Sequence, residues 1–154
     1  MWRRIGVCVA LLALSAGARA ADEPTYILVN AGAGRVDFAQ QNARHQRDGS
    51  VTLSILTVLA DNKVAYAMSD VSLNCGASTF AALGNVNYDS HGQQMAADPV
   101  DSTPQKIQEG TVGQSLKLFI CEGVDPYPRA KMLNGVSAAL SKARDLIGAM
   151  QKRN

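Results

Sequence analysis

The sequence has few of the residues that build redox and metal centres. Its 154 residues include three cysteines, two histidines and one tryptophan, and aromatic residues make up only 5%. The cysteines at positions 8, 75 and 121 form no C-x-x-C redox motif and are too few for a zinc site of paired ligands. Beyond residue 20 no apolar run approaches the roughly 18 residues of a membrane-spanning helix. These absences predict a soluble domain with no metal site or cofactor.

The N-terminus predicts a cleavable export signal. Residues 2–4 are basic at two positions, residues 5–17 are uncharged and mostly apolar, and residues 18–20 read Ala-Arg-Ala. A basic flank, a short apolar stretch and an A-x-A ending are the three parts of a secretory signal. Cys8 lies inside the apolar stretch, so it is lost with the signal and carries no lipid. We expect residues 1–20 to be removed and the mature chain to reach the periplasm or the outer surface of a bacterial cell. A retained helical anchor is the alternative.

Cleavage changes the charge balance of the chain. The full sequence holds 15 basic and 13 acidic residues, and the signal contains three of the arginines. The mature chain is therefore slightly acidic, which argues against nucleic-acid binding. Its charges are unevenly divided, because residues 21–128 are net acidic and residues 129–154 are strongly basic. The basic side chains that could contact an anionic partner are Arg129, Lys131, Lys142, Arg144, Lys152 and Arg153.

Two cysteines remain after cleavage, Cys75 and Cys121. An even pair in an exported chain predicts a disulfide, and two buried free thiols are the alternative. A bond between these positions would close a loop that the chain-entropy model values at roughly 4 kcal/mol. We expect a structural bond, because a redox centre would have paired nearby thiols at a helix start.

The hydrophobic pattern predicts an α+β fold with an antiparallel sheet of about six strands. Alternating or β-branched segments separated by turn signals such as Asp48-Gly49 indicate strands joined by hairpins. Spacings of three and four then indicate a short helix over residues 112–121 and a second helix over residues 129–151. The segments read as strands are residues 25–30, 35–39, 50–60, 64–75 and 79–89.

The second helix carries one apolar stripe. Residues 129–154 form the basic C-terminal unit, after a sheet domain of residues 21–128. We expect the helix to dock on that domain with Leu133, Leu140 and Ile147 inward, leaving its basic groups as a solvent-facing rim. Pairing with a twin helix in a homodimer, or lying on an anionic envelope surface, are the alternatives. The stripe consists of Leu133, Val136, Leu140, Ala143, Ile147 and Met150.

The order of features resembles the surface-adhesin protein E family of bacterial exported domains. The matching stretches are residues 66–75 (YAMSDVSLNC), 88–92 (YDSHG) and 107–121 (IQEGTVGQSLKLFIC). The resemblance covers about residues 25–122 and departs from the family where residues 101–103 replace a frequent tryptophan; the basic C-terminal helix also lies outside it. It implies an antiparallel sheet with a packed helix and, for some members, binding of host matrix proteins. No binding residue of the family maps onto this chain.

Catalytic chemistry has little support in the sequence. His45 and His91 lie in predicted polar loops or turns, and neither belongs to a nucleophile motif or has metal-ligand spacing. We therefore expect no catalytic residue and no enzyme activity. Two functions stay open: an exported binding or adhesion module with a protein or anionic surface as partner, and a periplasmic structural protein without a diffusible ligand.

Overall fold

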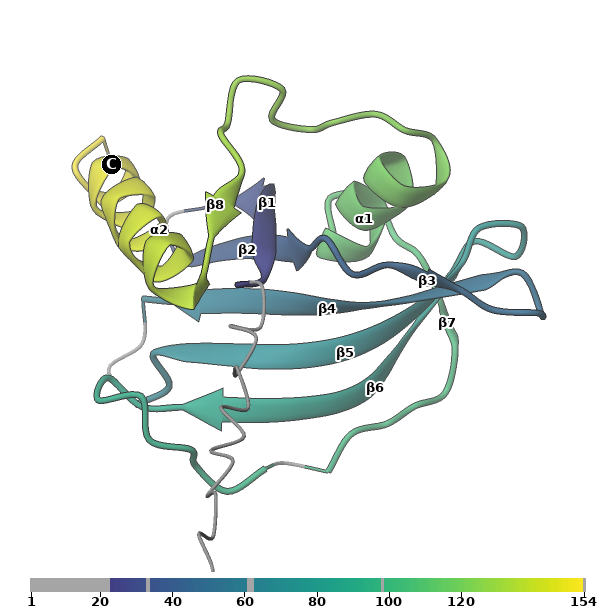
Figure 1. Cartoon of the computed structure of the whole chain (residues 1–154), viewed down its shortest axis with the longest axis horizontal. Helices are drawn as coiled ribbons and strands as arrows, with labels where there is room; N and C mark the ends of the chain where they lie inside the picture. Colours follow the sequence, from purple (N-terminus) through teal and green to yellow (C-terminus); the bar gives the residue numbers. More distant parts are fainter. Residues whose placement is uncertain (1–22, 33, 61–62, 98, 154) are drawn as a thin grey trace, which may run out of the picture.

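The computed structural model describes residues 23–32, 34–60, 63–97 and 99–153; the predicted signal at residues 1–20 lies outside these ranges. Over these described residues the chain folds as α+β, with an open antiparallel sheet of eight strands and two helices (Figure 1). The sheet order is β7-β6-β5-β4-β2-β1-β8, and β3 pairs with β4 outside this path. The elements are β1 (Thr25–Ala31), β2 (Arg35–Gln40), β3 (Arg44–His45), β4 (Ser50–Leu59), β5 (Tyr66–Asn74), β6 (Thr79–Tyr88), β7 (Gln105–Lys106), α1 (Val112–Cys121), β8 (Leu133–Asn134) and α2 (Val136–Gln151).

Short turns between successive strands produce the antiparallel pairing. At the β3–β4 turn, Gly49 has φ 81° and the Asp48 carboxylate accepts from the Ser50 amide at 2.9 Å and from the Ser50 hydroxyl at 2.7 Å. Glycine tolerates this left-handed backbone because it has no Cβ. These hydrogen bonds lower the pKa of Asp48, and the bond from the Ser50 hydroxyl has the larger effect. The Asp-Gly signal in the sequence therefore marks a real hairpin.

The sheet buries apolar side chains on both faces. Leu53 and Ile55 of β4 belong to a cluster with Leu116 of α1, whereas Leu56 and Val58 belong to a cluster with α2. Successive side chains of a strand point to opposite faces, so the two helices cover opposite faces of the sheet. Figure 1 shows them on either side of β1.

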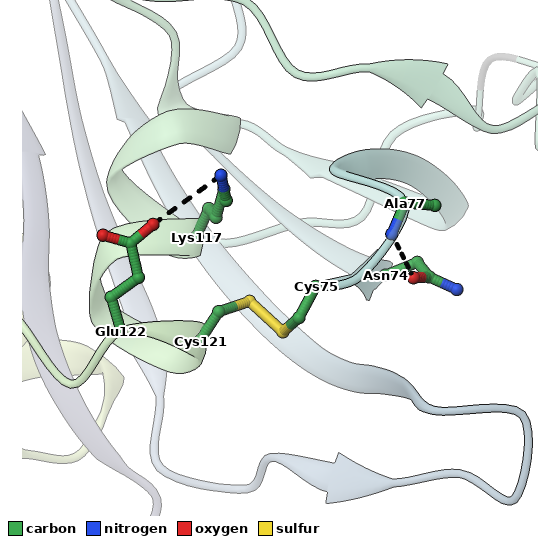
Figure 2. The surroundings of a disulfide bond; sticks show 6 residues. All are labelled: Asn74, Cys75, Ala77, Lys117, Cys121 and Glu122. Atoms are coloured by element: carbon green, nitrogen blue, oxygen red, sulfur yellow. Dashed lines mark hydrogen bonds and ion pairs between the residues drawn. A yellow bond between two sulfur atoms is a disulfide. The ribbon is translucent and has the colours of Figure 1, made fainter.

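A disulfide joins Cys75, just after β5, to Cys121 at the end of α1 (Figure 2). The two Cα atoms are 5.6 Å apart and the residues are 46 positions apart in the sequence. The predicted pairing is thus confirmed, and it ties α1 to the sheet. Beside it, the Lys117 ammonium lies 3.6 Å from the Glu122 carboxylate at the end of the helix.

The predicted start of the second helix is wrong. Residues 129–132 are irregular, and Leu133 lies in β8, where it pairs with Tyr26 of β1. Gly135 then has φ 80° and precedes the first helical residue, Val136. Leu133 therefore packs on the core from a strand, although its spacing continued the stripe of the helix. The expected count of about six strands was also low, because β3, β7 and β8 have two residues each.

Helix α2 docks on the sheet through the rest of its stripe. Ala139 and Ala143 have no exposed surface and Ile147 is 7% exposed, while Leu140 is partly buried against the same cluster. Their partners include Phe38 of β2. The predicted docking is confirmed for Leu140 and Ile147. Among the described residues, no helix is long and apolar enough to span a membrane.

Candidate functional site

The six basic residues of the C-terminal segment are all exposed. Among the residues that the structure describes, none of them forms an ion pair; the pairs found there are Arg35 with Asp37 and Lys117 with Glu122. Apolar packing therefore holds α2 on the domain, and the six basic side chains face solvent.

The structure does not gather these six charges into one patch. Lys142 and Arg144 are two positions apart on α2, so they lie about 200° apart around the helix axis and flank its buried face on opposite sides. Arg144 lines a cavity of about 570 Å³ between α2 and the end of β4, with Val58, Ile147 and Gln151. Lys131, Lys152 and Arg153 line none of the cavities described here.

Arg129 and Lys142 meet at a second groove, which has a volume of about 450 Å³. One wall is the segment of residues 126–130, and the other is the flank of α2 that carries Lys142 and Leu146. The groove thus places two unpaired cations beside an apolar surface. We call it the C-terminal groove; its lining residues are Leu28, Pro126, Tyr127, Pro128, Arg129, Ala130, Lys142 and Leu146.

Hydrogen bonds hold the wall of the C-terminal groove in place. The Ala31 amide of β1 donates to the Tyr127 hydroxyl at 3.0 Å, and the Tyr127 amide donates to the Asp125 carboxylate at 2.8 Å. The Ala130 amide donates to the Tyr127 carbonyl at 2.8 Å and closes a turn. Two prolines with restricted φ flank this tyrosine. These contacts fix the wall of residues 126–130 against β1.

A third cavity, of about 420 Å³, lies over β3, β4, β5 and β6, and most of its lining residues are polar. Its floor is a hydrogen-bonded chain in which Asn42 donates to the Ser54 hydroxyl at 3.2 Å and Ser54 donates to the Asp70 carboxylate at 2.6 Å. These groups satisfy one another. The exposed Arg44 also lines this cavity, together with the acidic Asp70, whereas the C-terminal groove has two cations and no acidic residue in its lining.

The one fully buried carboxylate among the described residues has a structural role. Asp37 accepts from Thr57 at 2.6 Å and from both Asn30 and Arg35 at 2.8 Å. Buried charges persist when they are paired and hydrogen-bonded. Because its partners come from β1, β2 and β4, Asp37 joins three strands. It lines none of the three cavities above.

Two tyrosines on the face of the sheet that α2 covers have raised pKa values. Burial, followed by the nearby Tyr66, raises the pKa of Tyr26; burial, followed by Tyr88 and Asp89, raises the pKa of Tyr66. The rings of Tyr66 and Tyr88 stack with centroids 4.6 Å apart. These groups line none of the three cavities and belong to packing.

The histidines lie apart from the groove. His45 is in β3, and His91 lies in the turn after β6, where its amide donates to Asp89 at 2.8 Å. Within the described ranges, no three histidine, cysteine or acidic side chains are grouped so that they could hold a metal ion. The sequence did not identify Tyr127 and Leu146 as residues of a groove. For Tyr127, the Pro-Tyr-Pro run at residues 126–128 was the available signal.

Neither a family model nor a curated protein sequence matches the chain. Its fold is similar to solved structures of Haemophilus influenzae protein E. One is 16% identical, with a TM-score of 0.50 over 69% of this chain and 88% of the other. Crystal form II is 12% identical, with a TM-score of 0.50 over 56% and 80%. The likeness establishes a protein E-like fold, as the resemblance implied, and at these identities it extends to the fold alone.

Proposed function

We propose that this protein is an exported, non-enzymatic binding module that contacts an acidic partner protein through its basic C-terminal segment. One observation carries the proposal: six exposed cations on residues 129–153 have no ion-pair partner among the described residues. Two of them, Arg129 and Lys142, also border the C-terminal groove.

Export is supported by the Cys75–Cys121 bond, because disulfides persist in oxidising compartments such as the periplasm and the cell surface. The protein E-like fold adds support for an adhesin-like role through the resemblance to surface adhesins described above. Cell fractionation combined with surface protease treatment tests the location. Cleavage of the protein on intact cells would favour adhesion, and full protection would favour a partner inside the envelope.

A direct test of binding uses poly-L-glutamate as the acidic polypeptide and phosphatidylglycerol vesicles as the anionic lipid. We expect the mature protein to bind poly-L-glutamate, with affinity falling as salt is raised, because exposed charges are screened over about 10 Å at 0.1 M ionic strength. Replacing all six basic residues of the C-terminal segment with glutamine should abolish this binding. Surface changes of this kind usually shift stability by no more than about 0.5 kcal/mol each.

The matched control neutralises exposed cations of the sheet: Arg44→Gln, Arg47→Gln and Lys106→Gln. We expect this variant to lose much less affinity for each charge removed. Equal loss per charge would mean that net charge alone drives binding, and the proposal would fail. Binding to vesicles without binding to poly-L-glutamate would assign the tail to the envelope surface instead.

A further inference from the structure

We propose that the C-terminal groove binds a peptide segment of the partner in which an acidic residue stands next to a large apolar residue. The proposal rests on the proposed function and names the ligand chemistry of one part of the basic segment. The apolar side chain would enter between Tyr127 and Leu146. The carboxylate would lie against Arg129 and Lys142.

The shape and charge of the groove favour this ligand. Its volume of about 450 Å³ is in the range of specific ligand sites. Leu28, Tyr127, Ala130 and Leu146 supply apolar surface, and the two cations are the only charged residues in its lining. A ligand that fills the groove must therefore be apolar at one point and anionic beside it.

Two exposed apolar side chains lie in the chain segment that forms one wall of the groove. Among the described residues, the exposed large hydrophobic side chains are Leu83, Val124 and Met132, at 50%, 49% and 62% exposure. Two of the three flank residues 126–130, in the segment that Figure 1 shows running from α1 to β8. Singly exposed apolar side chains are common on protein surfaces, so these two support the proposal only because they lie in the same chain segment as the groove wall.

The outward face of α2 argues against a membrane as the occupant. Its exposed positions carry small, polar or charged side chains: Ser137, Ser141, Lys142, Arg144, Asp145, Ala149 and Gln151. Helices that lie in a membrane interface insert large apolar side chains on their lipid-facing side. The large apolar residues of α2 instead face the sheet or the groove, so the helix has no apolar side to offer a bilayer.

The test uses three short peptides with blocked ends. The first contains a phenylalanine next to two aspartates, the second has alanine in place of phenylalanine, and the third has asparagine in place of both aspartates. Each is titrated into the ¹⁵N-labelled mature protein and followed by amide chemical shifts. We expect the first peptide to shift the amides of Ala130 and Leu146 and to leave those of Ser54 and Asp70, at the polar cavity, unchanged.

Affinity should depend on both halves of the ligand. Loss of the phenylalanine should weaken binding about tenfold, because each 1.4 kcal/mol of lost apolar burial is a factor of ten. The double variant Arg129→Gln with Lys142→Gln should weaken binding of the first peptide by up to about fivefold for each charge removed. The matched variant, Arg144→Gln with Lys152→Gln, removes the same charge from other sides of α2 and should have little effect.

The outcomes separate this inference from the proposed function. Suppose that poly-L-glutamate binding depends on the basic C-terminal segment, but the phenylalanine and alanine peptides bind with equal affinity. This result would overturn the groove assignment and leave the proposed function intact. Equal losses in the two double variants would do the same. If neither the peptides nor poly-L-glutamate bind, both proposals fail.

Discussion

Replacing Ile147 with alanine tests whether α2 is part of the folded core. The side chain is 7% exposed and packs with Ala143 and the sheet residues Phe38 and Leu56. The change removes three carbons, worth about 0.8 kcal/mol each by transfer, or roughly 2–3 kcal/mol. Such substitutions usually cost more when a closed void remains. Here the site borders the cavity of about 570 Å³ beside Arg144, so water can enter and we expect the lower end of the range.

The assay is urea unfolding of the mature domain, followed by circular dichroism. We expect a lower midpoint with an unchanged m-value, because the surface exposed on unfolding stays nearly the same. Lys142→Ala is the control and should shift the free energy of unfolding by no more than about 0.5 kcal/mol. The reasoning is refuted if Ile147→Ala behaves like the control. It is also refuted if amide hydrogen exchange shows α2 unprotected while the sheet remains protected.

Three further perturbations test the rest of the fold. Replacing Cys75 and Cys121 with serine should lower the free energy of unfolding by about 2–5 kcal/mol in a urea titration; an unchanged midpoint would count against the bond. Asp37→Asn should cost about 1–3 kcal/mol because a buried donor is left facing other donors, and a neutral result would show that the network is dispensable. The raised pKa values of Tyr26 and Tyr66 mean that their stabilisation is present below about pH 10 and is lost as the pH rises through those values. Replacing both with phenylalanine should flatten the alkaline part of a stability–pH curve, and an equally steep curve would contradict this assignment.

The strands of the central sheet were predictable because burial on a strand repeats every second residue. Segments of six to ten residues, such as β4, contain enough repeats for that pattern to be read. The two-residue strands contain none. β8 exists because Leu133 and Asn134 can pair with the free edge of β1, and that pairing depends on the path of the distant chain.

The error at the start of α2 has a specific cause. Leu133 stands three positions before Val136, so it continues the helical spacing although it belongs to a strand. Gly135 between them carried the correct signal, because a residue with positive φ ends or precedes a helix rather than continuing it. By its spacing, the helix appeared about seven residues too long at its N-terminus.

The basic character of the candidate site was visible in composition, whereas its shape was not. Counting charges identified Arg129 and Lys142 together with four others, and nothing in the count distinguished them. Their convergence depends on the turn at Tyr127, which a hydrogen bond from Ala31 anchors to β1. A contact between residues 96 positions apart is set by tertiary structure, so local sequence pattern could not predict it.

Helix α2 presents two separable surfaces. Its inward face, with Ala139, Ala143 and Ile147, stabilises the domain by apolar burial. The adjacent flank, with Lys142 and Leu146, forms one wall of the C-terminal groove. Undocking α2 would destroy the groove, because the same helix supplies the buried face and one wall of the groove. Neutralising Lys142 would weaken the proposed ligand contact and leave the fold unchanged. Loss of binding without loss of stability is therefore the signature that separates a recognition role for this helix from a purely structural one.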